Sequence, residues 1–315
     1  MTQSTKESQA QVARQLGDLQ RQISTIIKGK PGQIRDAVAC LIAGGHLLIE
    51  DLPGVGKTTL AHALAVSMGL KFSRLQFTAD LMPSDLLGVS IYEREKAGFV
   101  FHPGPVFAQV LLSDEINRAG PKTQSALLEA MEENQVSIDG ASHALPQPFF
   151  VIATQNPSEQ LGTYPLPESQ LDRFLMCISL GYPDSASERE LLMGQDSREA
   201  IRALRPLMTP ADVLTAQAAV KTIHASPALL DYLQALIAAT RSGQWFSEGL
   251  SPRAGLGVLR AARARALLDQ RDFVAPDDVQ AILPQTIAHR LRPRAGAGRG
   301  ATEQVRAMIE AIPLP

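Results

Sequence analysis

The chain has 315 residues, of which 45% are hydrophobic, 5% aromatic and 20% charged, with a formal net charge of -2 and a pI near 6.3. This length and composition are typical of a folded protein with room for two domains, and they exclude a chain that is disordered throughout. The slightly acidic balance provides no general field that would attract nucleic acid or an anionic membrane.

Neither a disulfide framework nor export is indicated. The two cysteines, Cys40 and Cys177, lie in apolar segments and lack the paired spacing of a metal or redox site, so we expect both to be core thiols. The N-terminus is polar, and no window approaches 18 uninterrupted apolar residues. We therefore expect a cytoplasmic protein without a membrane span.

The first 45 residues are predicted to be mostly helical. Apolar residues recur every three or four positions over 12–26 and again over 34–42, which is typical of two amphipathic helices. The stretch from His46 to Leu60, HLLIEDLPGVGKTTL, then has the pattern of a buried strand that runs through a glycine-rich turn into another helix. The rest of the predicted organisation follows from this stretch.

The glycine-rich turn has the features of a cradle for nucleotide phosphates. Gly54 and Gly56 let the backbone pass close to a phosphate, so that successive N–H groups can point at its oxygens. Lys57 would add positive charge beside the outer phosphates, and Thr58 would supply a hydroxyl to Mg²⁺. The usual pattern opens with glycine, whereas this turn opens with Asp51. The flanking strand and helix still favour a phosphate loop over a fortuitous glycine turn.

Four more strands are predicted in the first 180 residues. They cover residues 71–77, 109–112, 149–153 and 174–178. Helices lie between them, so the pattern predicts a three-layer α/β/α core around a five-stranded parallel sheet. Two hairpin insertions are expected, near 90–105 and near 136–145, and a loop is expected at 78–88.

The composition changes after residue 183, where strand patterns stop and alanine- and leucine-rich helices punctuated by prolines take over. This change predicts a second, all-α domain. We therefore expect a nucleotide-binding core over residues 1–183, including the two hairpin insertions, and a helical lid domain over residues 184–315.

Polar residues follow the ends of the predicted strands. Asp114 and Glu115 come directly after a buried strand, where Asp114 would hold Mg²⁺ through its water shell and Glu115 would polarise an attacking water. Asn156 follows the next strand and would donate to the γ-phosphate or to that water. Arg173 and Arg253 are candidates for stabilising negative charge in the transition state, although a lone arginine is more often a solvated surface residue.

In this order, the motifs resemble the MoxR family of AAA+ ATPases over nearly the whole chain. The matching stretches are EDLPGVGKTTLA, QFTADLMPSDLLG, GPVFAQVLLSDEINRA, ALLEAMEE, ATQNP, LPESQLDRF and SPRA. The phosphate loop of this family also tolerates an acidic first residue, as at Asp51. The resemblance implies an AAA+ α/β/α core with a helical lid, assembled as a ring, usually a hexamer, with ATP and Mg²⁺ at the subunit interfaces.

The resemblance also implies roles for individual residues. Those expected to bind nucleotide are the Walker A residues Pro53, Gly54, Val55, Gly56, Lys57, Thr58 and Thr59, the adenine-side Ile27 and Gly29, and the sensor 2 residue Arg253. Those expected to serve catalysis are Lys57, the Walker B residue Glu115, the sensor 1 residue Asn156 and the arginine finger Arg173. Mg²⁺ would be held by Thr58 and Asp114. Arg173 would reach a neighbour's γ-phosphate, and Arg253 would act on its own or the next subunit's nucleotide.

For function, the resemblance implies an ATP-driven remodelling or assembly chaperone. A partner with a von Willebrand factor A domain is expected, together with a client protein that matures by metal or cofactor insertion. The hairpins are expected to face the ring axis or this partner. Their aromatic residues Phe99, Phe101 and His143 would contact a client or, more simply, pack the hairpins themselves.

Two other functions remain open from the sequence. A nucleic-acid motor of the MCM kind shares the hairpin insertions, and its phosphate contacts would come from Arg290, Arg292, Arg294 and Arg299. The acidic net charge, the few aromatics and the lack of a basic or zinc-bearing domain make this reading weaker. A small-molecule kinase shares the phosphate loop and a lid, but it needs neither Glu115 beside Asp114 nor an arginine at an interface.

Overall fold

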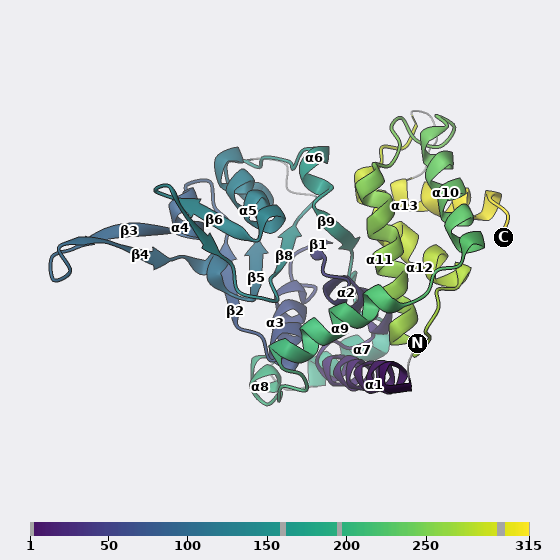
Figure 1. The fold of residues 1–315 in the computed structure, drawn as a ribbon, viewed down its shortest axis with the longest axis horizontal. Helices are drawn as coiled ribbons and strands as arrows, with labels where there is room; N and C mark the ends of the chain where they lie inside the picture. Colours follow the sequence, from purple (N-terminus) through teal and green to yellow (C-terminus); the bar gives the residue numbers. More distant parts are fainter. Residues whose placement is uncertain (1–2, 158–161, 194–196, 295–299, 315) are drawn as a thin grey trace.

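The computed structural model describes residues 3–157, 162–193, 197–294 and 300–314. Its centre is a parallel sheet of five strands in the order β2-β5-β8-β1-β9 (Figure 1). The strands are β1 His46–Glu50, β2 Phe72–Gln76, β5 Val110–Asp114, β8 Phe150–Gln155 and β9 Phe174–Ile178. The predicted five-stranded parallel sheet is therefore confirmed.

Alternating side chains of the strands build a separate core on each face of the sheet. On β1, Leu47 and Ile49 join the cluster that includes the first three helices, whereas Leu48 joins the cluster of the opposite face. The first three helices are α1 Gln3–Ile26, α2 Pro31–Ile42 and α3 Lys57–Ser67. The opposite face is covered by α4 Pro83–Leu87 and α5 Pro121–Glu133. The expected three-layer α/β/α arrangement follows.

The short helix α4 corrects one sequence-based expectation, because residues 78–88 were expected to form a loop. Pro83 occupies the first turn of the helix, where its missing N–H costs nothing. The carboxylate of Asp85 accepts the N–H of Met82 at 2.8 Å, and Leu86 is fully buried. A cap and one buried leucine thus fold a segment whose proline suggested a loop.

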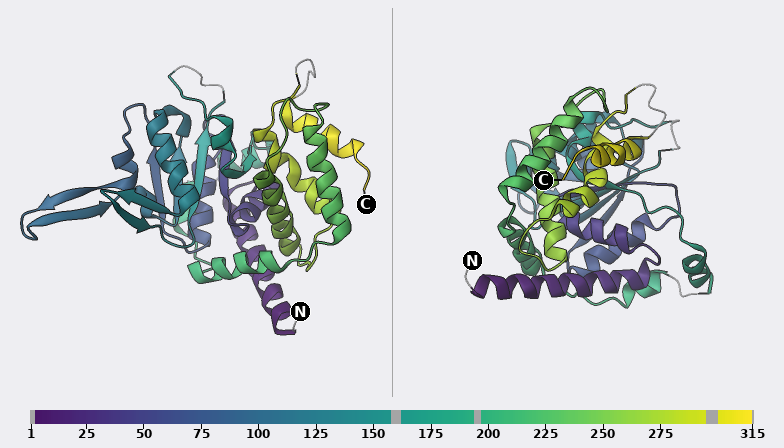
Figure 2. Two further views of the ribbon diagram at one scale, coloured as in Figure 1. Left: turned by 45° about the horizontal axis from the view of Figure 1, so that its top comes forward. Right: turned by 90° about the vertical axis from the view of Figure 1, so that its right-hand side faces the viewer.

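Two antiparallel hairpins interrupt the core. The longer one, β3 Gly88–Glu93 with β4 Gly98–Pro103, projects far from the body of the molecule (Figure 2). The shorter one consists of β6 Gln135–Ile138 and β7 Ala141–Ala144 and continues directly from α5. Both overlap the stretches where hairpins were expected, although β3 begins at Gly88 and β6 at Gln135, slightly earlier than predicted.

Aromatic residues join the two hairpins at their bases. The ring of Phe101 stacks on His143 with centroids 4.1 Å apart and meets Phe107 edge-on at 5.5 Å. Phe101 and His143 therefore pack the hairpins, which was the simpler of the two expectations. Phe99 differs, because it contacts only Tyr92 among the aromatic rings of the described residues and is 76% exposed.

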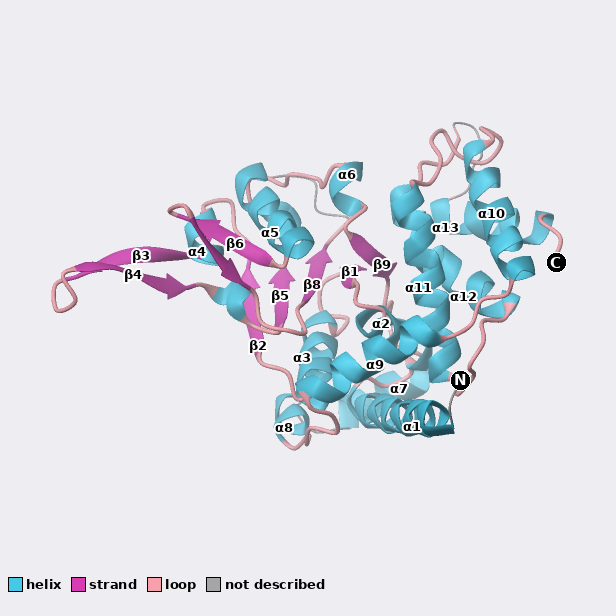
Figure 3. Ribbon diagram, in the orientation of Figure 1, coloured by secondary structure: helices cyan, strands magenta, loops and turns pink. Residues whose placement is uncertain are grey.

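After β9 the described chain is helical. Helices α10 to α13 lie beyond the β9 edge of the sheet, whereas α8 and α9 pack against the N-terminal helices (Figure 3). The helices are α6 Glu168–Leu171, α7 Ser185–Met193, α8 Ser197–Arg202, α9 Pro210–Thr222, α10 Pro227–Arg241, α11 Pro252–Leu268, α12 Pro276–Ile287 and α13 Ala301–Ala311. Four of the prolines that suggested breaks, Pro210, Pro227, Pro252 and Pro276, are first residues of α9 to α12, where proline is well accommodated. Pro284 was also expected to be a break, but it lies inside α12. The division at residue 184 stays a prediction.

Three short 3-10 turns complete the connections: η1 Pro105–Phe107, η2 Ile116–Arg118 and η3 Ala288–Arg290. Helices α11 and α12 pack directly on β9, so the helical part shares a core with the sheet. Within the described residues, no helix is both long and apolar enough to span a membrane. Burial raises the pKa of the thiols of Cys40 and Cys177. Cys40 is fully buried, as expected of a core thiol, whereas Cys177 is only partly buried and borders a cavity.

His46, the first residue of β1, connects three elements of the core. Its Nδ1 accepts the N–H of Val151 at 3.0 Å, and its Nε2 lies 3.3 Å from the carbonyl oxygen of Met131. Burial lowers the pKa of His46 to about 4, despite the favourable hydrogen bond to Met131. The folded protein therefore holds this imidazole neutral, with the proton on Nε2.

The lowered pKa of His46 predicts acid-dependent stability. Between pH 6.5 and pH 4 the unfolded chain protonates this residue and the folded chain does not, so the free energy of unfolding falls as the pH falls, by up to roughly 3 kcal/mol. In His46→Asn, which keeps an acceptor near Val151, urea unfolding should depend less on pH in this window. The same change at the exposed His224 should leave the dependence as in the wild type. Identical pH profiles for all three proteins would contradict this.

Candidate nucleotide site and arginine cavity

The predicted phosphate-loop residues meet Glu115 and Asn156 at the carboxyl edge of the sheet. Strand β8 lies between β1 and β5, so the segments that follow these three strands are neighbours, about 5 Å from one to the next. The N–H of Asp51 donates to Gln155 at 3.2 Å, which places the start of the glycine-rich loop beside the end of β8. Lys57 comes after β1, Glu115 after β5 and Asn156 after β8, so all three lie at this edge.

The loop has the backbone of an anion cradle. Gly54 and Gly56 have φ values of 84° and 96°, and a Cβ on either would meet nothing within 4 Å, so the left-handed backbone itself demands glycine. Helix α3 begins at Lys57 without a side-chain cap, which leaves the N–H groups of its first turn for a ligand. The ammonium of Lys57 donates to the carbonyl oxygen of Asp51 at 2.6 Å.

The carboxylate of Asp51 explains why this loop opens without glycine. One oxygen accepts the N–H groups of Leu180 and Gly181, both at 2.6 Å, and the hydroxyl of Ser179 at 3.0 Å. The other accepts the N–H of Leu52 at 2.8 Å. Burial alone would raise the pKa of Asp51, but these donors outweigh it and lower the pKa. Asp51 therefore ties the loop to the chain that follows β9.

Thr154 holds the two adjacent acidic residues at the end of β5. Its hydroxyl donates to Asp114 Oδ1 at 2.6 Å and accepts the N–H of Glu115 at 2.9 Å. The other oxygen of Asp114 pairs with Arg74 at 2.6 Å. Glu115 has φ 57° and ψ 51°, a left-handed conformation that costs a non-glycine residue about 1–3 kcal/mol. The strained backbone turns its side chain out of the strand direction.

The carboxylate of Glu115 is held by two donors that sequence reasoning missed. The amide of Gln76 and the guanidinium of Arg118 both reach Oε2, at 2.9 Å and 2.8 Å. Gln76 ends β2, so its position at the carboxyl edge follows from the predicted strand. Thr154 lies near the end of β8, two residues before Asn156. Gln76 and Thr154 could therefore have been found from the sequence as polar residues at the ends of predicted strands.

A cavity of about 430 Å³ beside the phosphate loop is large enough for a nucleotide. The predicted residues that line it are Ile27, Pro53, Gly54, Val55, Gly56 and Thr59. Gly29 does not line it. Its φ is 68°, and an added Cβ would lie 2.5 Å from the hydroxyl of Ser187, so Gly29 allows close packing of α7. The exposed apolar side chains of Tyr182 and Leu192 also border the cavity.

The residues at this edge fit Mg²⁺ bound together with phosphate. Asp114 offers a carboxylate and Thr58 offers a hydroxyl. In nucleotide sites, Mg²⁺ takes only a small share of its ligands from the protein. No group of three or more histidine, cysteine or acidic side chains suited to a metal occurs among the described residues. A metal there would therefore depend on phosphate oxygens and water for its other ligands.

The two candidate arginines lie at the opposite edge of the sheet. Arg173 directly precedes β9, whose five residues span about 16 Å, so the strand separates it from the phosphate loop of its own chain. Arg173 and Arg253 each bind one oxygen of Glu132, both at 2.8 Å. Two side chains 80 positions apart in sequence thus share one carboxylate. Glu132 lies in ALLEAMEE, and sequence reasoning assigned it no role.

These residues border a cavity of about 210 Å³, here called the arginine cavity. Its charged lining residues are Glu132, Asp172, Arg173, Arg253, Arg260 and Arg290. Arg290 binds Asp172 and the carbonyl oxygen of Phe174, both at 2.7 Å. The structure therefore brings Arg173 and Arg253 together, and places neither with Lys57 and Glu115.

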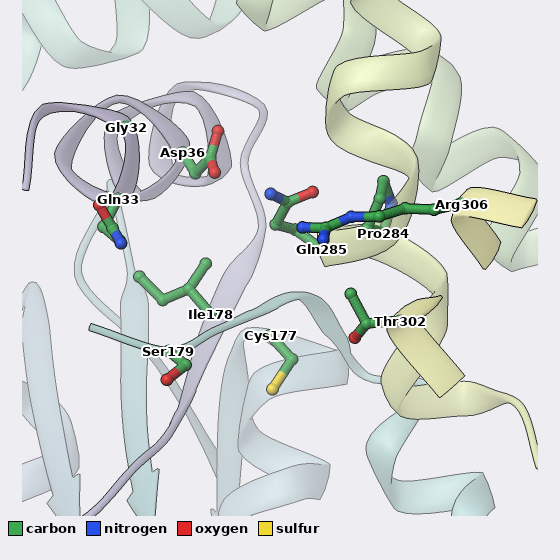
Figure 4. Close-up of a pocket in the computed structure, with 10 residues that line it drawn as sticks. All are labelled: Gly32, Gln33, Asp36, Cys177, Ile178, Ser179, Pro284, Gln285, Thr302 and Arg306. Atoms are coloured by element: carbon green, nitrogen blue, oxygen red, sulfur yellow. The ribbon is translucent and has the colours of Figure 1, made fainter. Parts of the chain in front are cut away.

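A third cavity, of about 350 Å³, lies between the core and the helical part (Figure 4). Asp36 of α2 faces Gln285 of α12, and Arg306 enters from α13. Burial raises the pKa of Asp36 to about 6, against the opposing charges of Arg265 and Arg35. None of the predicted nucleotide or catalytic residues lines this cavity, so it is not the nucleotide site.

Comparison with known proteins agrees with this geometry. The model of the ATPase family associated with various cellular activities (AAA) matches residues 46–176, and the model of the AAA lid domain matches residues 238–312. Protein YeaC of Bacillus subtilis is 45% identical over 95% of both chains. Chaperone MoxR1 of Mycobacterium tuberculosis is 42% identical over 86% of this chain and 74% of its own.

Two further similarities concern Protein MoxR of Methylorubrum extorquens and a solved structure. The former is 32% identical over 94% of both chains. A crystal structure of a candidate ATPase from Cytophaga hutchinsonii has a TM-score of 0.89 and 34% identity, and the match covers 99% of this chain and 98% of that one. The relatives match along both the core and the helical part. The chain is therefore a member of the MoxR family of AAA+ ATPases.

Proposed function

We propose that this protein hydrolyses ATP to ADP and phosphate at the subunit interfaces of a homo-oligomeric ring, most simply a hexamer. The observation that carries the proposal is the separation of two half-sites. The phosphate loop and Glu115 lie at the carboxyl edge of the sheet, whereas Arg173 and Arg253 lie together at the amino edge. A site that needs both halves is completed only when a second subunit supplies the arginines.

Within this site, the phosphate loop binds ATP through the N–H groups of α3, with Lys57 beside the outer phosphates and Thr59 along the cavity. Bound Mg²⁺, held by Thr58 and Asp114, would supply positive charge to the phosphate oxygens. Glu115 and Asn156 orient the attacking water, and Glu115 accepts its proton. The water oxygen attacks the γ-phosphorus, and the bond to the bridging oxygen of ADP breaks.

The neighbouring subunit contributes the remaining positive charge. Arg173 is the arginine finger, and Arg253 acts on the same nucleotide in trans, because both side chains share Glu132 in one cavity. An arginine finger is worth roughly 10³–10⁵ in rate. An isolated subunit lacks this charge, so assembly controls hydrolysis.

We further propose that hydrolysis serves protein remodelling. One relative carries the name chaperone, and the projecting β3–β4 hairpin, with its apolar Phe99 largely exposed, offers a surface for a protein. A partner with a von Willebrand factor A domain, and a client matured by metal or cofactor insertion, belong to this proposal.

A nucleic-acid motor is the weaker alternative. A likeness to a full-length MCM homologue of Methanopyrus kandleri, with a TM-score of 0.58 and 17% identity, concerns the fold alone. The arginines considered for phosphate contacts are engaged within the chain, with Arg290 on Asp172 and Arg292 on Glu168. Arg294 donates to Gly243 at 3.0 Å, and Arg299 lies outside the described residues. The kinase reading leaves Glu115 and Arg173 without a role.

The interfacial site predicts that ATPase activity per chain rises with protein concentration. Arg173→Ala should lower the rate by roughly 10³-fold or more at concentrations that form rings, because it removes the neighbour's charge. It should leave ATP binding by dilute subunits unchanged, since Arg173 is remote from its own phosphate loop. The exposed Arg205 gives a matched control, and Arg205→Ala should retain the wild-type rate. A concentration-independent rate that survives Arg173→Ala would refute the interfacial site.

The hydroxyl of Thr154 should matter for turnover more than for binding. Thr154→Val keeps the side-chain volume but removes the hydroxyl that binds both the carboxylate of Asp114 and the N–H of Glu115. We expect kcat to fall on the order of 10²-fold, with ATP affinity within a few-fold of the wild type. Thr154→Ser, which restores the hydroxyl, should recover most of the rate. Equal kcat for Thr154→Val and the wild type would show that Thr154 does not position the acidic pair.

A further inference from the structure

Arg260 lines the arginine cavity from the same face of α11 as Arg253. The two residues are seven positions apart, close to two helical turns, and Gly257 between them also lines the cavity. An added Cβ on Gly257 would lie 3.0 Å from the side chain of Leu175, so a larger residue there would crowd the cavity wall. The helix thus presents two guanidinium groups to one space.

The charges of the cavity do not balance. Arg173 and Arg253 bind Glu132, and Arg290 binds Asp172. Arg260 makes no hydrogen bond or ion pair with any residue in the described part of the chain. His46, which also lines the cavity, is neutral near pH 7. Four guanidinium groups therefore face two carboxylates, and two positive charges are unmatched.

An unmatched cation in a partly closed site costs free energy that an anion would remove. Burial lowers the pKa of Arg260, and the nearby charge of Arg253 lowers it further. The residue is nevertheless more than one third exposed, so an incoming ligand can reach it. A phosphate group carries close to two negative charges and offers several oxygens to planar guanidinium groups, which a single carboxylate does not.

We propose that Arg260 is a third phosphate-binding arginine, which joins Arg173 and Arg253 on the outer phosphates of the nucleotide held by the neighbouring subunit. In the isolated subunit, Arg173 and Arg253 bind Glu132 instead of that phosphate. Arg260 does not bind Glu132, and it binds the phosphate when the neighbour's nucleotide is present. This inference rests on the proposed interfacial ATPase.

The test compares Arg260→Ala and Arg260→Lys with a matched control, Arg263→Ala, on the same helix but outside the cavity lining. At ring-forming concentrations, Arg260→Ala should lower the ATPase rate by roughly 10- to 100-fold, a smaller loss than that of one well-placed donor in a transition state. Arg260→Lys, which keeps the charge, should retain more of the rate. Arg263→Ala should behave as the wild type.

Mixing separates action in trans from a defect within the chain. Arg260→Ala mixed with Glu115→Gln should regain activity, because the Arg260→Ala subunit brings an intact phosphate loop and Glu115 while the other brings an intact Arg260. Ring assembly, measured by sedimentation velocity, gives a second readout. ADP with beryllium fluoride, which mimics the γ-phosphate, should promote ring formation less in Arg260→Ala than in the wild type. ADP alone should promote ring formation equally in the two proteins.

The outcomes distinguish this inference from the proposed function. If Arg173→Ala remains active, the interfacial ATPase fails, and the role of Arg260 fails with it. If Arg173→Ala is inactive while Arg260→Ala matches the wild type, only the third arginine is refuted. The same holds if the mixture regains nothing. Binding of free inorganic phosphate by dilute subunits that depends on Arg260, with no effect on ATPase or assembly, would make the ligand a free anion and overturn the proposal.

Discussion

The parallel direction of the five strands is the constraint on which the proposed chemistry depends. Every strand ends at the same edge, so the strand direction alone brings the phosphate loop, Glu115 and Asn156 together there. Every strand also begins at the other edge, where Arg173 precedes β9 and Arg253 packs beside it. Because a five-residue strand is about 16 Å long, one chain cannot bring both groups to one phosphate. In the proposed function, the sheet therefore divides the site between two subunits.

Much of this arrangement was accessible from the residue pattern. Buried apolar runs that alternate with helical periodicity predicted the parallel sheet, and strand ends then located Asp114, Glu115 and Asn156 beside the phosphate loop. Gly54 and Gly56 were predicted from the backbone that a phosphate requires, and both have positive φ. These predictions succeed because they depend on short-range periodicity and on the polarity of a sheet, which a single sequence contains.

The contacts between distant segments could not be predicted from the sequence. Nothing near Asp51 in sequence indicates that its carboxylate binds the chain after β9, 130 residues away. The pairing of Arg173 and Arg253 with Glu132 likewise depends on how α11 packs against α5 and β9. The short helix α4 was missed because Pro83 suggested a loop, while the burial of Leu86 decided the structure. Such features need the three-dimensional packing that pattern reasoning lacks.

The most direct test of the divided site mixes two inactive proteins, Glu115→Gln and Arg173→Ala, and follows ATPase activity against their ratio. The account predicts that activity returns on mixing and peaks near equal amounts, because an intact Glu115 then meets an intact Arg173 across an interface. Size-exclusion chromatography should show that both variants still assemble. If both form rings and the mixture stays inactive at every ratio, the arginines do not act across the interface, and the central claim is contradicted.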